Sequence, residues 1–317
     1  SESSTNPSKY IAITPAQYLT PKNGVEISNQ NLRGIANGAK YIIITHKNFL
    51  EQAERLKRYR ESENIVPLST VVVDIEHIFN EFSCGAKDVS AIRDFIAYAY
   101  QNWTVQPEYV LLFGDGDYDF KKIDGHNKNF VIPYQTENSF DEIDSYCTDD
   151  FFARIVGVDS FVDIAIGRLN INSNSEAKLV IDKIIDYETN ADRGAWRNRI
   201  TLVADDGKTS KQDDGSKHTG QSEDLSRLIP NSYDLKKIYL AAYPTVITGL
   251  GRRKPEVNRA IVDAVNEGTL ILNFIGHGSP DLWTHEQVFV RSVSIPQFVN
   301  KNYFFLTAAT CDFGYYD

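Results

Sequence analysis

Residues 269–278 read TLILNFIGHG, an almost unbroken apolar run that ends in a glycine–histidine–glycine turn. Residues 303–308, YFFLTA, form a second run of the same kind near the end of the chain. Strands buried on both faces of a helix-covered parallel sheet have this composition, whereas half-exposed strands alternate apolar and polar residues. We therefore expect two central strands here, and they decide the fold of the second half of the chain.

The same pattern extends outward, because short strand-like runs alternate with segments of helical periodicity from residue 39 onward. Strands are expected at 41–45, 68–73, 109–113, 162–166, 200–204 and 237–240, and helices at 49–60, 89–103, 173–187, from 222 onward and at 255–266. Alternating strands and helices are typical of parallel sheets with helices on both faces. The predicted fold class is therefore α/β, with doubly wound, mostly parallel sheets.

The chain divides at two changes in composition. Residues 1–38 are rich in Ser, Asn, Thr, Gly and Pro without sustained periodicity, so they are expected to form a leader or linker segment. A polar stretch at 189–198 interrupts the alternation of strands and helices. With about 150 residues per domain as a guide, we expect a first α/β lobe at 39–194 and a second at 195–317.

Composition and charge exclude several classes of function. The net charge of −10 at pH 7 would repel polyanions, so nucleic-acid binding is not expected. No apolar run approaches the roughly 20 residues of a membrane helix, so no transmembrane segment is expected. The cysteines Cys84, Cys147 and Cys311 lack the close spacing of a zinc cluster, and no metal site is predicted from them.

The candidate chemistry lies just beyond the strands, where parallel sheets bind their ligands. His277 and Cys311 each follow one of the two apolar strands, so pairing of those strands would bring them together. A neighbouring imidazole stabilises the thiolate that makes cysteine a nucleophile, and the N–H groups of Gly278 and Cys311 would stabilise an oxyanion. The alternative, a hydrogen-bonded turn histidine beside a small buried cysteine, fits the spacing equally well.

Acidic residues at two other strand ends are further candidates. Asp205 or Asp206, after the strand at 200–204, would either orient the imidazole or cap a loop. The alternating aspartates at 115–119 suggest a cation loop, but position six of that loop is Phe120 and position twelve is not Glu. Because calcium loops of the EF-hand type need Gly and Glu there, a solvated acidic turn is the favoured interpretation.

The other histidines fit the role of general base less well. His77 lies in a helical pattern, and His126 and His218 lie in polar loops. His46 ends a strand, but in the other lobe, and is the one serious rival to His277.

At these positions the sequence resembles peptidase family C25, the gingipain-type cysteine peptidases, which implies a caspase-like fold. The resemblance rests on the two turns that carry the histidine and the cysteine. It extends more loosely to LLFGDGDYD at 111–119, DDFFARIVG at 149–157 and IAIGRLN at 164–170 with its following helix. Within the family, GHGSPDLWTHE from Gly276 and TAATCDFGYYD from Thr307 are most similar to the PorU-like sortases of the type IX secretion system.

The resemblance implies a role for each residue of the site. Cys311 matches the nucleophile, His277 the general base, Asp206 the acidic third member, and the Gly278 and Cys311 N–H groups the oxyanion hole.

Substrate contacts are implied at Trp283 and Thr219. In the arginine-specific gingipains an aspartate in the loop and helix start before the histidine and cysteine binds the basic side chain, and Thr219 or His218 stands there in this chain. Arginine specificity is therefore not expected.

The implied activity is that of a cysteine peptidase and transpeptidase. Such an enzyme removes a C-terminal sorting domain from type IX secreted cargo through a thioester, with release to water or to an amine of lipopolysaccharide. The resemblance also implies a location outside the cytoplasm, secreted or at the bacterial outer-membrane surface, an outer-membrane partner protein, and no cofactor required for catalysis.

Two alternatives stay open: a secreted gingipain-like endopeptidase, and a non-catalytic surface scaffold whose acidic strand ends hold structural calcium. Because the family continues with a helix and strands after the nucleophile, the second lobe is expected to be truncated after the Cys311 strand.

Overall fold

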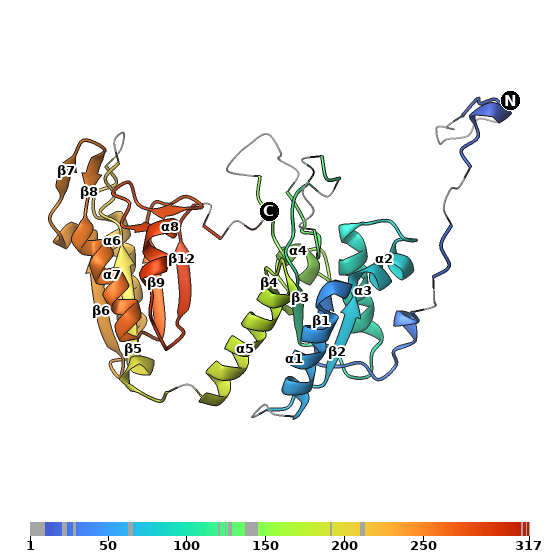
Figure 1. The fold of residues 1–317 in the computed structure, drawn as a ribbon, viewed down its shortest axis with the longest axis horizontal. Coiled ribbons are helices and arrows are strands. Elements are labelled where there is room, and N and C mark those ends of the chain that lie inside the picture. Colours follow the sequence, from blue (N-terminus) through green and yellow to red (C-terminus); the bar gives the residue numbers. More distant parts are fainter. Residues whose placement is uncertain are drawn as a thin grey trace.

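The computed structural model contains two groups of strands, each flanked by helices (Figure 1). It describes residues 10–20, 24–27, 30–62, 66–119, 121–123, 125, 129–136, 145–190, 192–209, 213–311, 313–314 and 316. His126 lies outside the described residues. We call the group formed by residues 41–190 the first lobe and the group formed by residues 195–311 the second lobe.

The first lobe is built on a four-stranded parallel sheet in the order β2-β1-β3-β4. Its strands are β1 (Tyr41–Thr45), β2 (Thr70–Asp74), β3 (Tyr109–Phe113) and β4 (Ala165–Leu169). The predicted bounds hold for β1 and β3, and β2 is shifted by one or two residues. The last strand begins three residues later than expected, since Val162 is exposed and precedes it.

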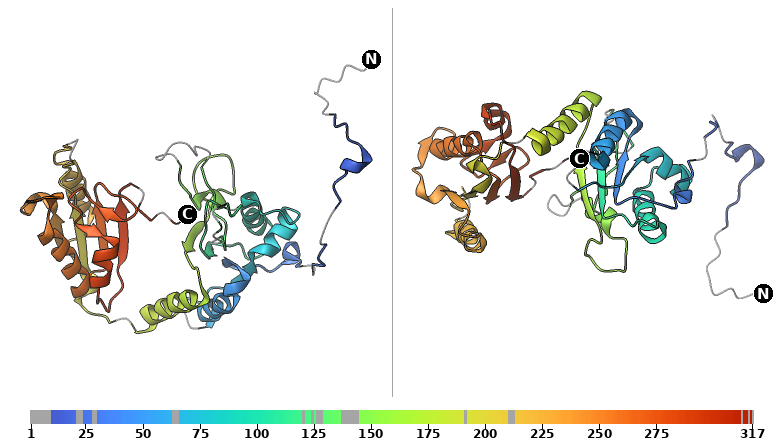
Figure 2. Two further views of the ribbon diagram at one scale, coloured as in Figure 1. Left: turned by 45° about the horizontal axis from the view of Figure 1, so that its top comes forward. Right: turned by 90° about the horizontal axis from the view of Figure 1, so that it is seen from below.

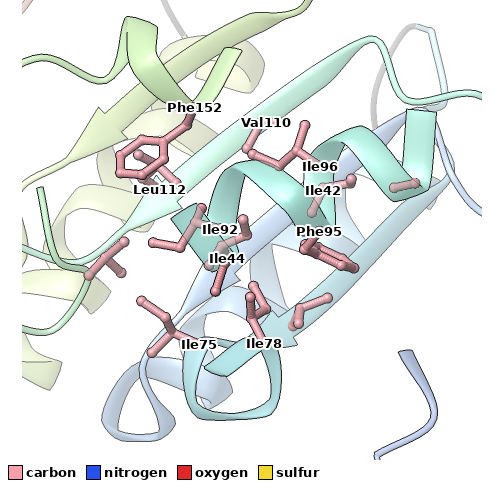
Figure 3. Close-up of a cluster of buried hydrophobic side chains, with 14 of the residues drawn as sticks. Ile42, Ile44, Ile75, Ile78, Ile92, Phe95, Ile96, Val110, Leu112 and Phe152 are labelled. Carbon is pink, nitrogen blue, oxygen red and sulfur yellow. The ribbon is translucent and has the colours of Figure 1, made fainter. Parts of the chain in front are cut away.

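Helices cover both faces of this sheet. They are α1 (Leu50–Ser62), α2 (Ile75–Phe82), α3 (Val89–Asn102), the short α4 (Asp150–Ala153) and α5 (Asn174–Asn190). Ile42 and Ile44 pack into one cluster with α2 and α3, whereas Ile43 packs into the opposite cluster with α1 and α5. Figure 3 shows the first of these clusters, in which Phe95 and Ile96 of α3 meet the strand side chains. Side chains alternate across a strand, so the unbroken apolar run of β1 supplies both cores.

The second lobe is built on a parallel sheet in the order β12-β9-β5-β6. Its strands are β5 (Arg199–Ala204), β6 (Asp234–Tyr239), β9 (Ile271–Ile275) and β12 (Phe305–Ala309). The sheet lies between helices α6 (Lys217–Leu228) and α7 (Pro255–Glu267), as the right-hand view of Figure 2 shows. Two hairpins complete the lobe, β7 (Val246–Thr248) with β8 (Gly251–Arg253) and β10 (Leu282–Trp283) with β11 (Phe289–Val290).

Two expectations for the second lobe were wrong. In the described residues β12 is an edge strand rather than a central one, and Phe305 on it is 67% exposed. An apolar run shows that both faces of a strand are apolar, but it does not show that both edges are paired. Helix α6 begins at Lys217, five residues before the predicted start, so the polar loop is shorter than expected.

Several short elements complete the structure. They are α8 (Arg291–Ser294) and the 3-10 turns Pro15–Gln17, Leu32–Gly34, Lys47–Phe49, Ala195–Asn198, Leu240–Ala242 and Ile295–Gln297. Part of the predicted leader packs on the first lobe, because Leu32 is buried and its N–H donates to Glu81 at 2.7 Å. Among the described residues, none of the helices is both long and apolar enough to cross a bilayer.

Candidate active site

His277 and Cys311 leave two neighbouring strands at the same level. Ile275 of β9 is in register with Ala309 of β12, and each of the two candidate residues lies two positions further along its strand. The Gly276 N–H donates to the Ala309 carbonyl at 3.2 Å, so the pairing continues past the strand ends. Cys311 is exposed and its thiol is free. The sheet therefore places the backbones of His277 and Cys311 at the ends of neighbouring strands.

The two glycines that flank His277 are required by packing. A Cβ atom on Gly276 would overlap the side chain of Asp205, and one on Gly278 would overlap the Thr310 hydroxyl. The absence of side chains at both positions lets the histidine turn pass close to β5 on one side and to the cysteine turn on the other.

Asp205 holds the backbone of the histidine turn in place. This residue is almost fully buried at the end of β5, and its N–H donates to the Ile275 carbonyl at 3.0 Å. One carboxylate oxygen accepts the His277 N–H at 3.0 Å and the other accepts the Gly207 N–H at 3.2 Å. A charge-assisted bond to a backbone N–H is stronger than a neutral one, so Asp205 fixes the position of His277 rather than its protonation.

Asp214 is the carboxylate that contacts the imidazole. Its Oδ2 lies 2.9 Å from His277 Nε2. The loop after β5 doubles back to bring it there, with Gly207 at φ 73° and the Asp214 N–H donating to the Gly207 carbonyl at 2.9 Å. The predicted third member was Asp205 or Asp206, and Asp214 was not considered. The clue in the sequence was the Asp-Asp-Gly turn at 213–215, which allows this reversal.

Asp206, predicted as the third catalytic member, does not face the imidazole in this structure. Its Oδ2 lies 3.4 Å from both Arg252 Nη2 and Lys254 Nζ. Lys254 is only 3% exposed and also donates to the Leu240 and Tyr243 carbonyls, at 2.8 and 2.7 Å. A buried ammonium of this kind needs a counter-ion, so the geometry gives Asp206 a charge-neutralising role.

His218 is a functional candidate that the sequence prediction placed in a loop. It lies in the first turn of α6, faces the sheet, and is only 9% exposed. Its ring packs edge-to-face on His277 with centroids 5.1 Å apart, and its Nε2 lies 3.7 Å from Asp214 Oδ2. Neither ring nitrogen has a hydrogen-bond partner in the described part of the chain. An unsatisfied buried polar group costs about 1–3 kcal/mol, which marks His218 as more than a packing residue.

The two predicted substrate-binding residues lie in different surroundings. Trp283 is 1% exposed and stacks between Phe274 and Phe289, with ring centroids 4.3 and 4.6 Å away, so it is a core residue and does not reach a substrate. The β10–β11 hairpin folds this side chain inward. Thr219 lines a cavity of about 500 Å³ together with Asp206. A substrate contact at Thr219 stays a prediction.

The remaining candidates lie in the first lobe. His46 follows β1, where its Nδ1 accepts the Asn48 N–H at 3.3 Å and burial lowers the pKa of its ring. Asp115 is buried and accepts a bond from Asn172 at 2.7 Å, while the Asp117 carboxylate accepts the Asp119 N–H at 2.8 Å. These bonds give the acidic turn a structural role, and calcium binding there stays a prediction.

The segment after Cys311 reaches the first lobe. Tyr316 donates to the Asp149 carboxylate at 3.0 Å, and Asp149 forms a bidentate ion pair with the buried Arg168. Burial raises the pKa of the Tyr316 phenol, so it stays a hydrogen-bond donor at physiological pH. The segment that follows Cys311 is thus hydrogen-bonded to the first lobe.

Curated proteins with a similar sequence include two gingipains. Gingipain R2 of Porphyromonas gingivalis is 24% identical over 265 residues, which is 81% of this chain and 31% of the relative. Gingipain R1 of the same organism is 25% identical over 215 residues, 65% of this chain and 19% of the relative. The chain therefore spans less than a third of these curated relatives.

Solved structures share the fold. The Arg-specific cysteine proteinase gingipain R (RgpB) matches with a TM-score of 0.62 at 23% identity, over 86% of this chain and 54% of that one. Dimeric latent PorU from Porphyromonas gingivalis matches with 32% identity and a TM-score of 0.49, over 57% of this chain and 18% of that one. The match to gingipain R confirms the predicted caspase-like α/β fold.

A family model settles the assignment, because it spans nearly the whole chain. The model for peptidase family C25 matches residues 35–317, which include both strand ends, the Asp214 turn and the helix that carries His218. The chain therefore belongs to peptidase family C25, a family of cysteine peptidases.

Proposed function

We propose that this chain carries the catalytic site of a cysteine peptidase, with Cys311 as the nucleophile and His277 as the general base. The observation that carries this proposal is the shared register of the two strands, which sets both residues two positions beyond a paired Ile275 and Ala309. The carboxylate of Asp214, 2.9 Å from His277 Nε2, supplies the third group.

We also propose a role for each of the two nitrogens of the His277 ring. The Asp214 carboxylate can only accept, so it favours the tautomer with the proton on Nε2. Nδ1 is then free to take the proton of the Cys311 thiol. The thiolate attacks the peptide carbonyl, and the oxyanion accepts bonds from the Gly278 and Cys311 N–H groups.

The intermediate then collapses, since His277 returns its proton to the leaving amine as the C–N bond breaks. A thioester on Cys311 remains. Water or a second amine attacks the thioester, His277 takes the proton of that nucleophile, and the thiol is restored. In this proposal the chain supplies the Cys311 thiol, the His277 imidazole and two backbone N–H groups, and no cofactor is required.

A PorU-like sortase is the more specific activity that we propose. The segments GHGSPDLWTHE from Gly276 and TAATCDFGYYD from Thr307 support it. In this proposal the enzyme lies outside the cytoplasm at the outer-membrane surface, with a partner protein there. It removes a C-terminal sorting domain from exported cargo and transfers the acyl group to water or a lipopolysaccharide amine. A gingipain-like endopeptidase is the second candidate, because the curated relatives named above are gingipains.

The paired thiol and imidazole predict fast alkylation of Cys311. In the full-length protein at pH 6, we expect site-resolved mass spectrometry to show Cys311 reacting at least about tenfold faster than Cys84, since an imidazolium partner stabilises a thiolate. The exposed Cys84 is the internal control. In His277→Ala the Cys311 rate should fall to the Cys84 rate, and an unchanged rate would contradict the proposal.

The sortase activity predicts selective cleavage. We expect the full-length protein to cut a cargo protein that carries its C-terminal sorting domain, and to leave the same cargo without that domain intact. The measurement is mass spectrometry of the products, with an added primary amine as an acceptor. Cleavage of both cargo forms and of unrelated unfolded proteins would instead favour the endopeptidase.

A further inference from the structure

Three side chains with metal-binding atoms, those of Asp214, His218 and Asp205, lie around the His277 ring. Asp214 Oδ2 lies between two imidazole nitrogens, 2.9 Å from His277 Nε2 and 3.7 Å from His218 Nε2. One ligand atom each from Asp205, His218 and His277 also lies within 4.8 Å of the other two. The four come from three different segments, namely the end of β5, the start of α6 and the turn after β9.

His218 is the observation that points to a ligand. The residue is only 9% exposed, and neither of its ring nitrogens has a hydrogen-bond partner in the described residues. The ring nevertheless packs at 5.1 Å on His277 and faces Asp214. The peptidase mechanism proposed above assigns no step to His218. A buried imidazole directed at a carboxylate and a second imidazole is the donor set of a zinc site.

We propose that His277, His218, Asp214 and Asp205 bind a zinc ion, and that the bound ion holds the peptidase in an inactive state. In a tetrahedral zinc site with bonds of about 2.0–2.1 Å, neighbouring ligand atoms lie roughly 3.3 Å apart. The two Asp214 contacts, at 2.9 and 3.7 Å, bracket that value. Asp205, whose ligand atom lies within 4.8 Å of one on each histidine, is held by bonds to backbone N–H groups.

The charges of the donor set suit a divalent cation. Two carboxylates and two neutral imidazoles give a site charge of −2 before the metal binds, which zinc cancels. Asp205 already accepts two N–H bonds, but a carboxylate offers about four lone-pair positions, so acceptor capacity remains. The neighbouring Asp206 is excluded from this site, because its charge is matched by Arg252 and Lys254.

Zinc on His277 would remove the general base. A neutral imidazole that binds a metal through Nε2 carries its proton on Nδ1, so it has no lone pair for the Cys311 proton. Asp214, which orients the ring in the free enzyme, becomes a metal ligand at the same time. Binding of zinc is independent of the peptidase proposal, whereas the inhibitory effect depends on that proposal.

The binding experiment uses full-length protein that also carries Cys311→Ala, so that the readout does not depend on catalysis. Zinc chloride is titrated by calorimetry, and cobalt(II) chloride is titrated in parallel and followed by visible absorption. We expect one high-affinity zinc per chain, and a cobalt spectrum of tetrahedral nitrogen and oxygen ligands. His218→Gln and His277→Gln should each weaken zinc binding at least about tenfold. His285→Gln, at an exposed histidine of the same lobe, is the matched control and should bind as the parent does.

The zinc affinities of the variants test the proposed site. Equal zinc affinity in His218→Gln and the parent, with all melting temperatures alike, would overturn the site. A thiolate charge-transfer band in the cobalt spectrum would also overturn it, because cysteine would then be the ligand. For the wild-type enzyme, one equivalent of zinc should abolish peptide cleavage and a chelator should restore it. If zinc binds tightly and the binding depends on the histidines, but peptide cleavage is not inhibited, the zinc site is supported and its regulatory role is rejected.

Discussion

Replacing Cys311 with alanine is expected to lower kcat/KM for peptide cleavage by about 10⁶-fold, the loss seen when the nucleophile of a catalytic triad is removed. In the proposed mechanism the thiol supplies the electron pair that forms the acyl-enzyme. The thiol is exposed at the open edge of the sheet, so its removal leaves no cavity. The unfolding midpoint in denaturant should therefore stay unchanged.

The measurement is steady-state kinetics on a peptide or cargo substrate, with denaturant unfolding of the same preparations. Cys84→Ala is the matched control, since Cys84 is also exposed but lies after α2 in the first lobe. A loss smaller than tenfold in Cys311→Ala, or an equal loss in both variants, would show that Cys311 is not the nucleophile.

Replacing Asp214 with asparagine is expected to lower kcat by about 10³- to 10⁴-fold with little change in KM. Asparagine has nearly the same shape but places an N–H or a neutral oxygen at His277 Nε2, so the ring loses the carboxylate that selects its tautomer. The pH–rate profile of Asp214→Asn should change with it, which a purely structural role would not produce.

Asp206→Asn is the matched comparison, because Asp206 was the acidic residue expected beside the histidine. Here we expect a stability effect instead of a rate effect. Removal of its charge leaves the buried Lys254 without a counter-ion, and breaking a buried pair in this way costs about 3–5 kcal/mol of unfolding free energy. If Asp206→Asn lost kcat and Asp214→Asn did not, the roles of the two residues would be reversed.

The sequence was most informative where apolar periodicity is strong. The runs at β1, β3 and β9 predicted strands with small errors, since burial on both faces leaves no other pattern. The pairing of β9 with β12 followed from two such runs, and it places His277 and Cys311 at the same strand ends. Which edge of β12 is paired is a matter of topology, and no local pattern encodes it.

The sequence was least informative around α6. The residues of this helix that are buried are His218, Ser222 and Ser226, so the apolar stripe that normally reveals a helix is missing. Ser216 at its N-cap makes no side-chain capping bond either. The position of Asp214 beside the ring also depends on its contact with His277, which lies 63 residues further along the chain.

Trp283 was predicted to contact a substrate, but the structure buries it in the core. An aromatic residue five positions after the end of the glycine–histidine–glycine turn would reach a substrate if the turn continued outward. The β10–β11 hairpin reverses the chain instead, and stacking on Phe274 and Phe289 buries the ring. A two-residue strand carries too little pattern to predict such a hairpin.

The register between β9 and β12 has a consequence for the evolution of this lobe. The separation of the histidine and cysteine backbones is set by the spacing of paired strands, not by the 279–304 connection that follows the histidine turn. Insertions or deletions within that connection would leave the pair in place, whereas a one-residue slip of either strand would send its side chain to the opposite face. The connecting segment can therefore change in length during evolution. The constraint falls on the few paired residues of β9 and β12 that set the distance between the histidine and the cysteine.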